Sequence, residues 1–205
     1  MPLTTLVEQQ DAVKRWLWDR DDLSAMYADF VTLCEAKLNN NLRVWQMETS
    51  TSVTLSSGTG SLPSDYLAWR RVNSSDNPVR QLEWLEPNAA EYNYFANTAA
   101  GIAEHFTITG STIRTFPPAS GSSLTLLYYQ KIPSLLTNAS GNWVTARSPG
   151  LYLYGTLLQA APFLDDDERA QTWGLLYSSE LQDLKGADKA ARYSKPVMRV
   201  SGATP

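Results

Sequence analysis

Residues 148–184 read SPGLYLYGTLLQAAPFLDDDERAQTWGLLYSSELQDL, and this stretch predicts two consecutive helices. The first, from about residue 149 to 164, is apolar on almost every side, so it must be covered by its own domain or by a neighbouring subunit. The second opens with the carboxylates 165–168, which suit a helix N-terminus, and then places apolar residues at helical spacing. A buried helix followed by an amphipathic one is typical of a scaffold or an assembly subunit.

Outward from this stretch, the chain divides into helical ends and a β-rich middle. Residues 1–41 carry apolar residues at helical spacing, with Thr5 as a candidate N-cap. Residues 42–135 hold short strands separated by turns that contain Gly or Pro. Helices and strands segregated along the chain predict an α+β fold. We expect residues 1–41 and 136–185 to form terminal α-helices packed into one helical lobe. Residues 42–135 would form a central antiparallel β insertion, a small sheet or barrel.

Several elements of the β insertion are predicted individually. The strands are expected at residues 44–55, 66–72, 79–85, 106–108, 113–116 and 124–132. We expect 66–72 and 79–85 to pair across the turn at 74–78, and a short helix within 87–96. The segment 134–148 reads as a loop.

Few residues in the chain suit catalysis or metal binding. The single histidine, His105, lies in a strand-like segment without a nucleophile and an orienting acid in a recognisable setting. The single cysteine, Cys34, lies in an apolar helical run and predicts a small buried thiol. Carboxylates 165–168 predict helix capping, because consecutive residues of one helical turn point in different directions. We therefore expect no catalytic, cofactor-binding or metal-binding residues, and no enzyme activity.

The composition excludes two further classes of protein. The net charge is −4, whereas phosphate binding needs clusters of Lys and Arg, so sequence-specific nucleic-acid binding is not expected. Neither a long apolar leader nor a run of transmembrane length is present, so we expect no membrane contact. With its one cysteine, the chain suits a protein made in a reducing cytoplasm.

Three segments resemble the head-to-tail adaptor proteins of tailed bacteriophages. Residues 151–184 are similar to the family's C-terminal pattern, LYLYASLLEAAPFLKDDERA followed by spaced Trp, Tyr and Leu. Residues 62–72, LPSDYLAWRRV, and 124–133, LTLLYYQKIP, resemble two of its strands and occur in the same order. Beyond residue 184 we find no family pattern to match.

The resemblance implies a structural virion protein of the neck, between head and tail, made in the host cytoplasm. It implies a homo-oligomeric ring, a dodecamer, that binds the portal protein and a downstream tail or nozzle protein. Genomic DNA would pass through the channel of the ring without sequence-specific binding. An acidic body suits a surface past which DNA slides.

An alternative function is a carbohydrate-binding β module of a tail or cell-surface protein. Trp45, Trp69 and Trp84 would then form a stacking platform, which requires all three side chains on one exposed face. We favour core positions for them, because a fully exposed tryptophan is uncommon.

The last segment, residues 186–205, predicts an extended basic tail. Its sequence, GADKAARYSKPVMRVSGATP, carries several basic residues against the single acid Asp188 and has little apolar periodicity. Such a tail is expected to dock on an acidic groove of an adjacent subunit or of the portal, because its sparse apolar groups do not offset the entropy of ordering it alone. The expected interface residues are Lys189, Arg192, Tyr193, Lys195, Val197, Met198 and Arg199.

Overall fold

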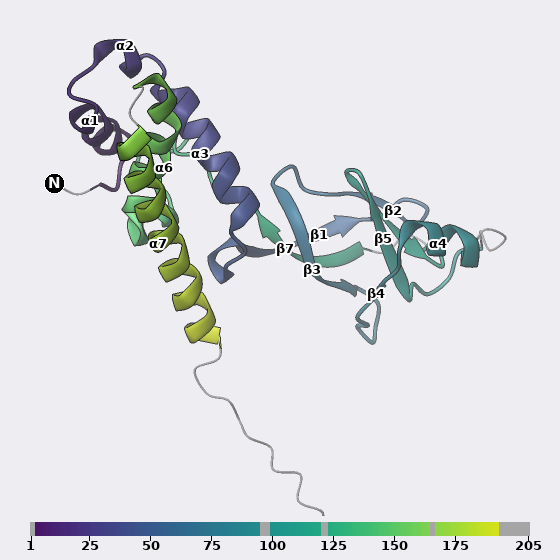
Figure 1. Cartoon of the computed structure of the whole chain (residues 1–205). Coiled ribbons are helices and arrows are strands. Elements are labelled where there is room, and N and C mark those ends of the chain that lie inside the picture. The colour runs from purple at the N-terminus through teal and green to yellow at the C-terminus, as the bar shows by residue number, and fades with distance from the viewer. Residues whose placement is uncertain (1–2, 95–98, 120–122, 165–166, 193–205) are drawn as a thin grey trace, which may run out of the picture. The chain divides into compact units, whose positions relative to one another are not determined.

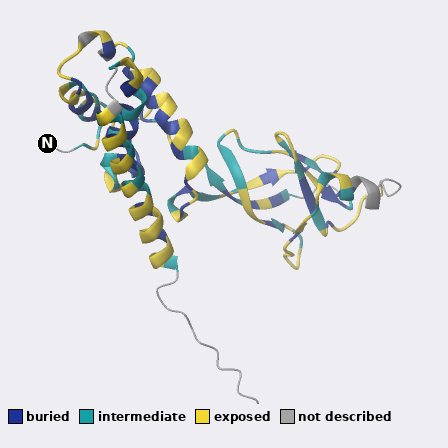
Figure 2. Cartoon of the chain, in the orientation of Figure 1, coloured by how far each residue is buried: buried dark blue, intermediate teal, exposed yellow. Residues whose placement is uncertain are grey.

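The computed structural model describes residues 3–94, 99–119, 123–164 and 167–192 (Figure 1). The chain divides into two compact units, which we call the helical unit (Met1–Trp45 and Ile132–Pro205) and the β unit (Gln46–Lys131). The α+β class predicted from the sequence is confirmed. Neither sheet formed by the described residues closes into a barrel. Buried residues gather inside each unit separately (Figure 2).

The helical unit is built from helices contributed by both ends of the chain. They are α1 (Leu6–Trp16), α2 (Asp21–Ser24), α3 (Tyr27–Asn41), α5 (Trp143–Arg147), α6 (Pro149–Ala160), the 3-10 turn η2 (Ala161–Phe163) and α7 (Asp167–Arg192). Thr5 caps α1 as expected, because its side chain accepts the N–H of Glu8 and its own N–H is bound by the Glu8 carboxylate. None of the described helices combines the length and the apolar character that crossing a bilayer requires.

Helix α6 lies at the centre of the helical unit. It packs against α1, α3, α5 and α7, and its leucines Leu151, Leu153 and Leu157 are buried. Gly155 permits the close approach of α3, because a Cβ there would overlap the Sγ of Cys34. Among the described residues the apolar helix is therefore covered largely by its own unit, while Tyr154 and Leu158 are half-buried and Phe163 in η2 is 49% exposed.

Polar side chains of α3 hold the segment by which the chain re-enters the helical unit. Asn39 Oδ1 accepts the N–H of Ile132 at 2.9 Å, and Glu35 Oε1 accepts the N–H of Leu135 at 2.7 Å. Glu35 and Asn39 are four residues apart, so they lie on the same face of α3. The pair fixes the start of the segment that leads to α5 and α6.

Helix α7 corrects the predicted start of the tail. We expected the last helix to end near residue 185, because Gly186 follows, yet α7 continues to Arg192. Glycine lowers helix propensity only by about 1 kcal/mol. Asp188, one turn further on, is held by contacts described below. Trp173, Tyr177 and Leu184 are buried, so α7 is amphipathic as predicted.

The β unit contains two sheets that share one apolar core. Its elements are the 3-10 turn η1 (Trp45–Met47), which begins at the last residue of the helical unit, and β1 (Glu48–Thr54), β2 (Thr59–Ser61), β3 (Tyr66–Ser74), β4 (Glu83–Trp84), α4 (Pro87–Tyr94), β5 (His105–Thr109), β6 (Thr112–Phe116) and β7 (Ser123–Gln130). The three-stranded sheet has the order β1-β7-β3 and is antiparallel, and the four-stranded sheet has the order β2-β6-β5-β4. Val72, Phe106, Ile113 and Leu126 lie in the core that joins them.

The local predictions for the β unit were partly wrong. The hairpin of β5 and β6 is confirmed, with Gly110 at φ +60° in the turn. The expected strand 79–85 is reduced to β4, which pairs in parallel with β5. The chain touches β3 only briefly around Gln81 and then crosses to the other sheet at Leu82, whose side chain enters the shared core. In the helical unit, the expected loop 134–148 contains α5, which is too short to produce a readable helical period.

Candidate functional site

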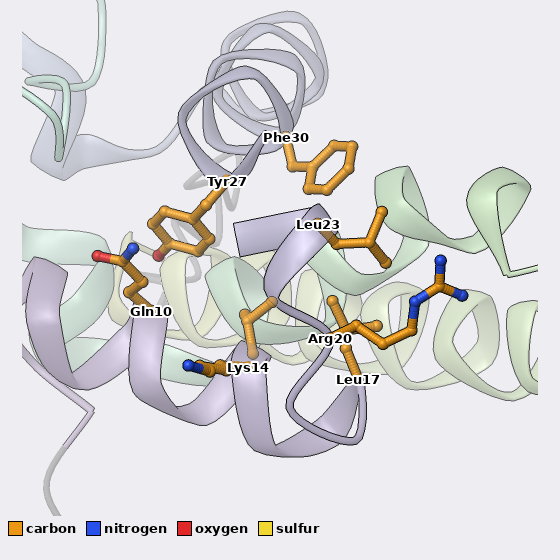
Figure 3. A pocket seen from close by; sticks show the side chains of 8 residues that line it. Gln10, Lys14, Leu17, Arg20, Leu23, Tyr27 and Phe30 are labelled. Atoms are coloured by element: carbon orange, nitrogen blue, oxygen red, sulfur yellow. The ribbon is translucent and has the colours of Figure 1, made fainter. Parts of the chain in front are cut away.

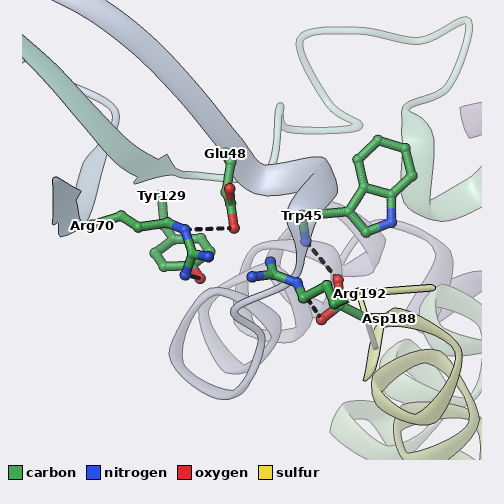
Figure 4. A network of polar contacts seen from close by, with 6 residues as sticks. All are labelled: Trp45, Glu48, Arg70, Tyr129, Asp188 and Arg192. Carbon is green, nitrogen blue, oxygen red and sulfur yellow. Dashed lines mark hydrogen bonds and ion pairs between the residues drawn. The ribbon is translucent and has the colours of Figure 1, made fainter. Parts of the chain in front are cut away.

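The C-terminal end of α7 is tied to Trp45 through Asp188 (Figure 4). Asp188 Oδ1 accepts the backbone N–H of Trp45 at 2.8 Å, and Oδ2 pairs with Arg192 Nε at 3.1 Å. Asp188 is only 9% exposed, so its charge-assisted contacts are largely shielded from water. The structure therefore gives the one acid of the predicted tail an anchoring role that the sequence did not indicate.

The predicted docking residues are only partly described. Lys189 is exposed on the last turns of α7, whereas Arg192 directs its guanidinium to Asp188 within the same helix. The other predicted residues lie outside the described residues: Tyr193, Lys195, Val197, Met198 and Arg199. Of the predicted set, the described part of the chain thus places one exposed cation and one ion-paired cation at the end of α7.

Two tryptophans, the exposed Trp18 and the buried Trp173, flank Arg169 near the start of α7. The Arg169 guanidinium lies 4.0 Å from the ring centroid of Trp18 and 4.9 Å from that of Trp173. Its Nη2 donates a hydrogen bond to the Trp16 carbonyl at 2.8 Å. Trp18 is 73% exposed and has φ +57°, a conformation rare for a bulky residue. A preorganised tryptophan beside an arginine is the composition of a protein-interface hot spot. The run WLW at 16–18 is the only sequence signal for it.

The second set of aromatic residues corrects a prediction. We expected Trp45, Trp69 and Trp84 to lie in the core, yet they are 50%, 39% and 47% exposed. Trp69 packs edge-on against the buried Phe106 at 5.2 Å, and Trp84 stands opposite Phe106 in the strand register. Each ring thus lies at the margin of a unit, since tryptophan combines a large apolar area with a polar N–H.

A polar network lies inside the helical unit, and its chemistry is structural. Asn142 donates to the Tyr152 hydroxyl at 2.7 Å, which in turn donates to Glu35 Oε1 at 3.1 Å. Burial raises the pKa of the Tyr152 hydroxyl, so the phenol remains a neutral donor. Burial also raises the pKa of the Cys34 thiol to about 12, which keeps it protonated and unreactive at neutral pH.

The histidine lies beside a groove of the β unit. His105 Nε2 is 3.9 Å from Glu83 Oε2, across the paired strands β5 and β4. The groove has a volume of about 270 Å³ and is lined by Arg80, Gln81, Glu83, Ala103, Glu104 and His105. Within the described part of the chain, no three His, Cys, Asp or Glu side chains are grouped as metal ligands. The arrangement also lacks a nucleophile held by a base.

Figure 3 shows a second hollow, between α1, α2 and α3. Leu17, Leu23, Tyr27 and Phe30 line it, with polar residues at its rim. Its volume of about 10 Å³ is close to the smallest space that holds one water molecule. The hollow is therefore a packing seam and not a ligand site.

An ion pair and a hydrogen bond of Arg70 lie within the three-stranded sheet of the β unit. Arg70 pairs with Glu48 at 3.2 Å and donates to the Tyr129 hydroxyl at 3.2 Å (Figure 4). This contact joins β3, β1 and β7, the strands of the three-stranded sheet. The pair is partly exposed, so it contributes at most about 1 kcal/mol to stability.

Comparison with known protein families gives a match over nearly the whole chain. A family model described as SU10 adaptor protein matches residues 4–200. The matched range includes the whole β unit and nearly all of the helical unit. A search of curated proteins finds no match.

Proposed function

The chain belongs to the SU10 adaptor protein family, a family of phage head–tail adaptors, and we propose that it forms the ring that connects the portal to the tail. As a structural phage adaptor it acts at the head–tail junction of the virion. In the proposed ring, a dodecamer, one side binds the portal and the other binds the next tail or nozzle protein. The channel of the ring continues the path of the DNA.

The observation that carries this proposal is the family match over residues 4–200. The net charge of −4 favours a channel wall to which DNA does not adhere. The Trp18–Arg169 cluster offers an exposed, preorganised contact surface on the helical unit. A closed ring needs a heterologous contact, in which each copy presents two different faces to its neighbours.

We further propose that the protein has no catalytic activity and works by assembly alone. The buried thiol of Cys34 and the half-buried His105 are not held in a catalytic arrangement. The proposed docking residues remain those expected from the sequence, of which Lys189 is exposed at the end of α7: Lys189, Arg192, Tyr193, Lys195, Val197, Met198 and Arg199. Basic residues there suit an acidic groove on the portal or on a neighbouring copy.

Native mass spectrometry of the chain mixed with purified portal tests the proposal. We expect a complex in which the chain is bound in a fixed ring stoichiometry, and the chain with Trp18→Ala should form fewer complete rings. Lys37→Ala, at an exposed site on α3, is the matched control and should assemble normally. A chain that stays monomeric with the portal, or forms only two-fold dimers, contradicts the proposed ring.

Sugar binding is the second candidate, favoured by the exposure of Trp69 and Trp84 in the β unit. The Trp69 ring packs against Phe106, and Trp84 is paired with Phe106 in the strand register. Stacking on exposed aromatic rings is a common way to bind sugars. A glycan-binding assay decides between the adaptor ring and the sugar-binding module. A chain that binds a glycan, loses that binding with Trp84→Ala and forms no ring would support the sugar-binding module.

A further inference from the structure

One edge of the three-stranded sheet is long and regular, and β2 lies against its C-terminal end, where Gly60 is close to Val53 and Thr54. This edge is β1, which pairs with β7 from Glu48 to Thr54 without a register shift. Apart from this ladder, the described residues provide no backbone hydrogen bond to residues 49–54. In an antiparallel pair every second residue turns its N–H and C=O away from the partner, so about three of these residues present both groups outward.

The other sheet edges in the described chain are blunted. β3 has register shifts at Tyr66/Ala68 and Trp69/Arg71, and residues 80–82 bind its C-terminal half. β2 and β4 span three and two residues. Natural sheets protect their edges with bulges, short strands, Lys or Pro, and the β1 sequence ETSTSVT contains none of these. An open edge beside blunted ones indicates a place for an added strand.

We propose that residues 193–205 of a neighbouring copy add to the β1 edge as a further strand. This inference rests on the proposed ring, in which adjacent copies must contact each other. Each copy would offer one tail and one β1 edge, two different surfaces as a heterologous contact requires. Backbone hydrogen bonds would supply most of the attraction, and alternate side chains would set the register.

Residues 198–200 of the tail alternate as β1 does, whereas Val197 before them is apolar and shares the side of Arg199. Along β1 the odd-numbered residues are more buried than the even-numbered ones: Thr49, Thr51 and Val53 against Ser50, Ser52 and Thr54. In the tail, Met198 and Val200 flank Arg199. A strand with Met198 and Val200 on the inner side of the sheet leaves the Arg199 guanidinium on the outer, exposed side.

The charge of residues 193–205 and the extent of the family match both support this segment as the strand added to β1. Residues 193–205 contain Lys195 and Arg199 and no acidic residue, whereas the net charge of the whole chain is −4. A basic tail is therefore drawn to the acidic remainder of another copy. The family match extends to residue 200, so Met198 to Val200 fall inside the matched region. Pro196 precedes them, at a position where a strand tolerates proline.

Hydrogen exchange on the full chain, with and without a synthetic peptide of residues 193–205, is the first test. In the dilute monomer we expect the outward amides of residues 49–54 to exchange freely, and saturating peptide to slow them about tenfold. The matched control peptide carries Met198→Pro, which removes one backbone donor and should not protect β1. β1 amides already protected in the monomer, or unaffected by the peptide, overturn the inference.

Disulfide trapping identifies the source of the strand. Chains carrying Ser52→Cys and chains carrying Arg199→Cys, both on the outer side of the sheet, are mixed and oxidised, while the native Cys34 is buried and does not compete. We expect a mixed dimer of the two chains, and none when Ala203→Cys replaces Arg199→Cys. A Ser52→Cys chain that links to its own kind instead indicates edge-to-edge pairing and contradicts tail docking. Rings that form without β1 protection refute this inference alone, whereas protection without rings refutes only the ring.

Discussion

Replacing the buried carboxylate of α3 with Glu35→Ala is predicted to destabilise the helical unit strongly. Glu35 is 8% exposed and its Oε1 accepts two hydrogen bonds, from the Leu135 N–H at 2.7 Å and from the Tyr152 hydroxyl at 3.1 Å. Alanine removes both acceptors. It leaves a buried backbone N–H without a partner on the segment that re-enters the helical unit.

The expected loss follows from these two contacts. A hydrogen bond to a charged group is worth about 1.5–3 kcal/mol, and an unsatisfied buried donor costs about 1–3 kcal/mol. The Tyr152 hydroxyl keeps its bond from Asn142, so the terms do not add fully. We expect a loss of about 3 kcal/mol in the free energy of unfolding, a large share of the roughly 5–15 kcal/mol typical of a domain. Glu35→Gln keeps an acceptor oxygen and should cost about 1 kcal/mol.

Urea denaturation followed by far-UV circular dichroism measures this loss, because the signal reports mainly on the helices. Lys37→Ala, an exposed position on the same helix, is the control and should change the free energy of unfolding by less than about 0.5 kcal/mol. A Glu35→Ala chain as stable as the Lys37→Ala chain would refute the claim that Glu35 fixes the segment at Leu135.

Three further predictions concern single sites. Gly155→Ala places a Cβ against Cys34 Sγ and should lower the free energy of unfolding by about 1–3 kcal/mol. At Gly186 an added Cβ meets no atom within 4 Å, so Gly186→Ala should raise the free energy of unfolding by up to about 1 kcal/mol. Urea denaturation measures both changes, and equal effects would contradict the close packing of α6 on α3. Cys34, with its pKa raised to about 12, should react with a thiol reagent at pH 8 at least about a hundredfold more slowly in the native protein than in urea, and equal rates would place it at the surface. Hydrogen bonds from the backbone of Thr5 and Thr4 lower the pKa of the Glu8 carboxyl. The contribution of Glu8 to stability is therefore present at pH values above the ordinary pKa of 4.5 and is lost as the pH falls through the lowered pKa. Glu8→Gln should flatten this part of the curve of stability against pH, and an unchanged curve would count against the capping box.

The fold class was predictable because it depends on local periodicity. The helical spacing of Trp173, Tyr177 and Leu184 and the turn residue Gly110 each specify a local structure, and both were read correctly. The covering of α6 was not predictable, since a helix that is apolar on every side does not say which helices pack on it.

The contacts that join distant parts of the chain leave no local signal. Asp188 and Trp45 are 143 positions apart, and Glu35 and Leu135 are 100 apart. In the sequence, Asp188 is one acidic residue among basic ones and gives no sign of its contact with Trp45. The predicted end of the last helix was therefore wrong. The tryptophans were misjudged for a different reason: an amphipathic ring suits the core and the margin of a unit equally well.

A cryo-electron microscopy map of the assembled phage particle tests the central claim most directly. The account predicts copies of this chain arranged as a closed ring around the DNA channel, between the portal and the next tail component. Each copy would contact its neighbours through two different faces. Density for the chain at a tail fibre or tail tip, or its absence from the particle, would contradict the claim.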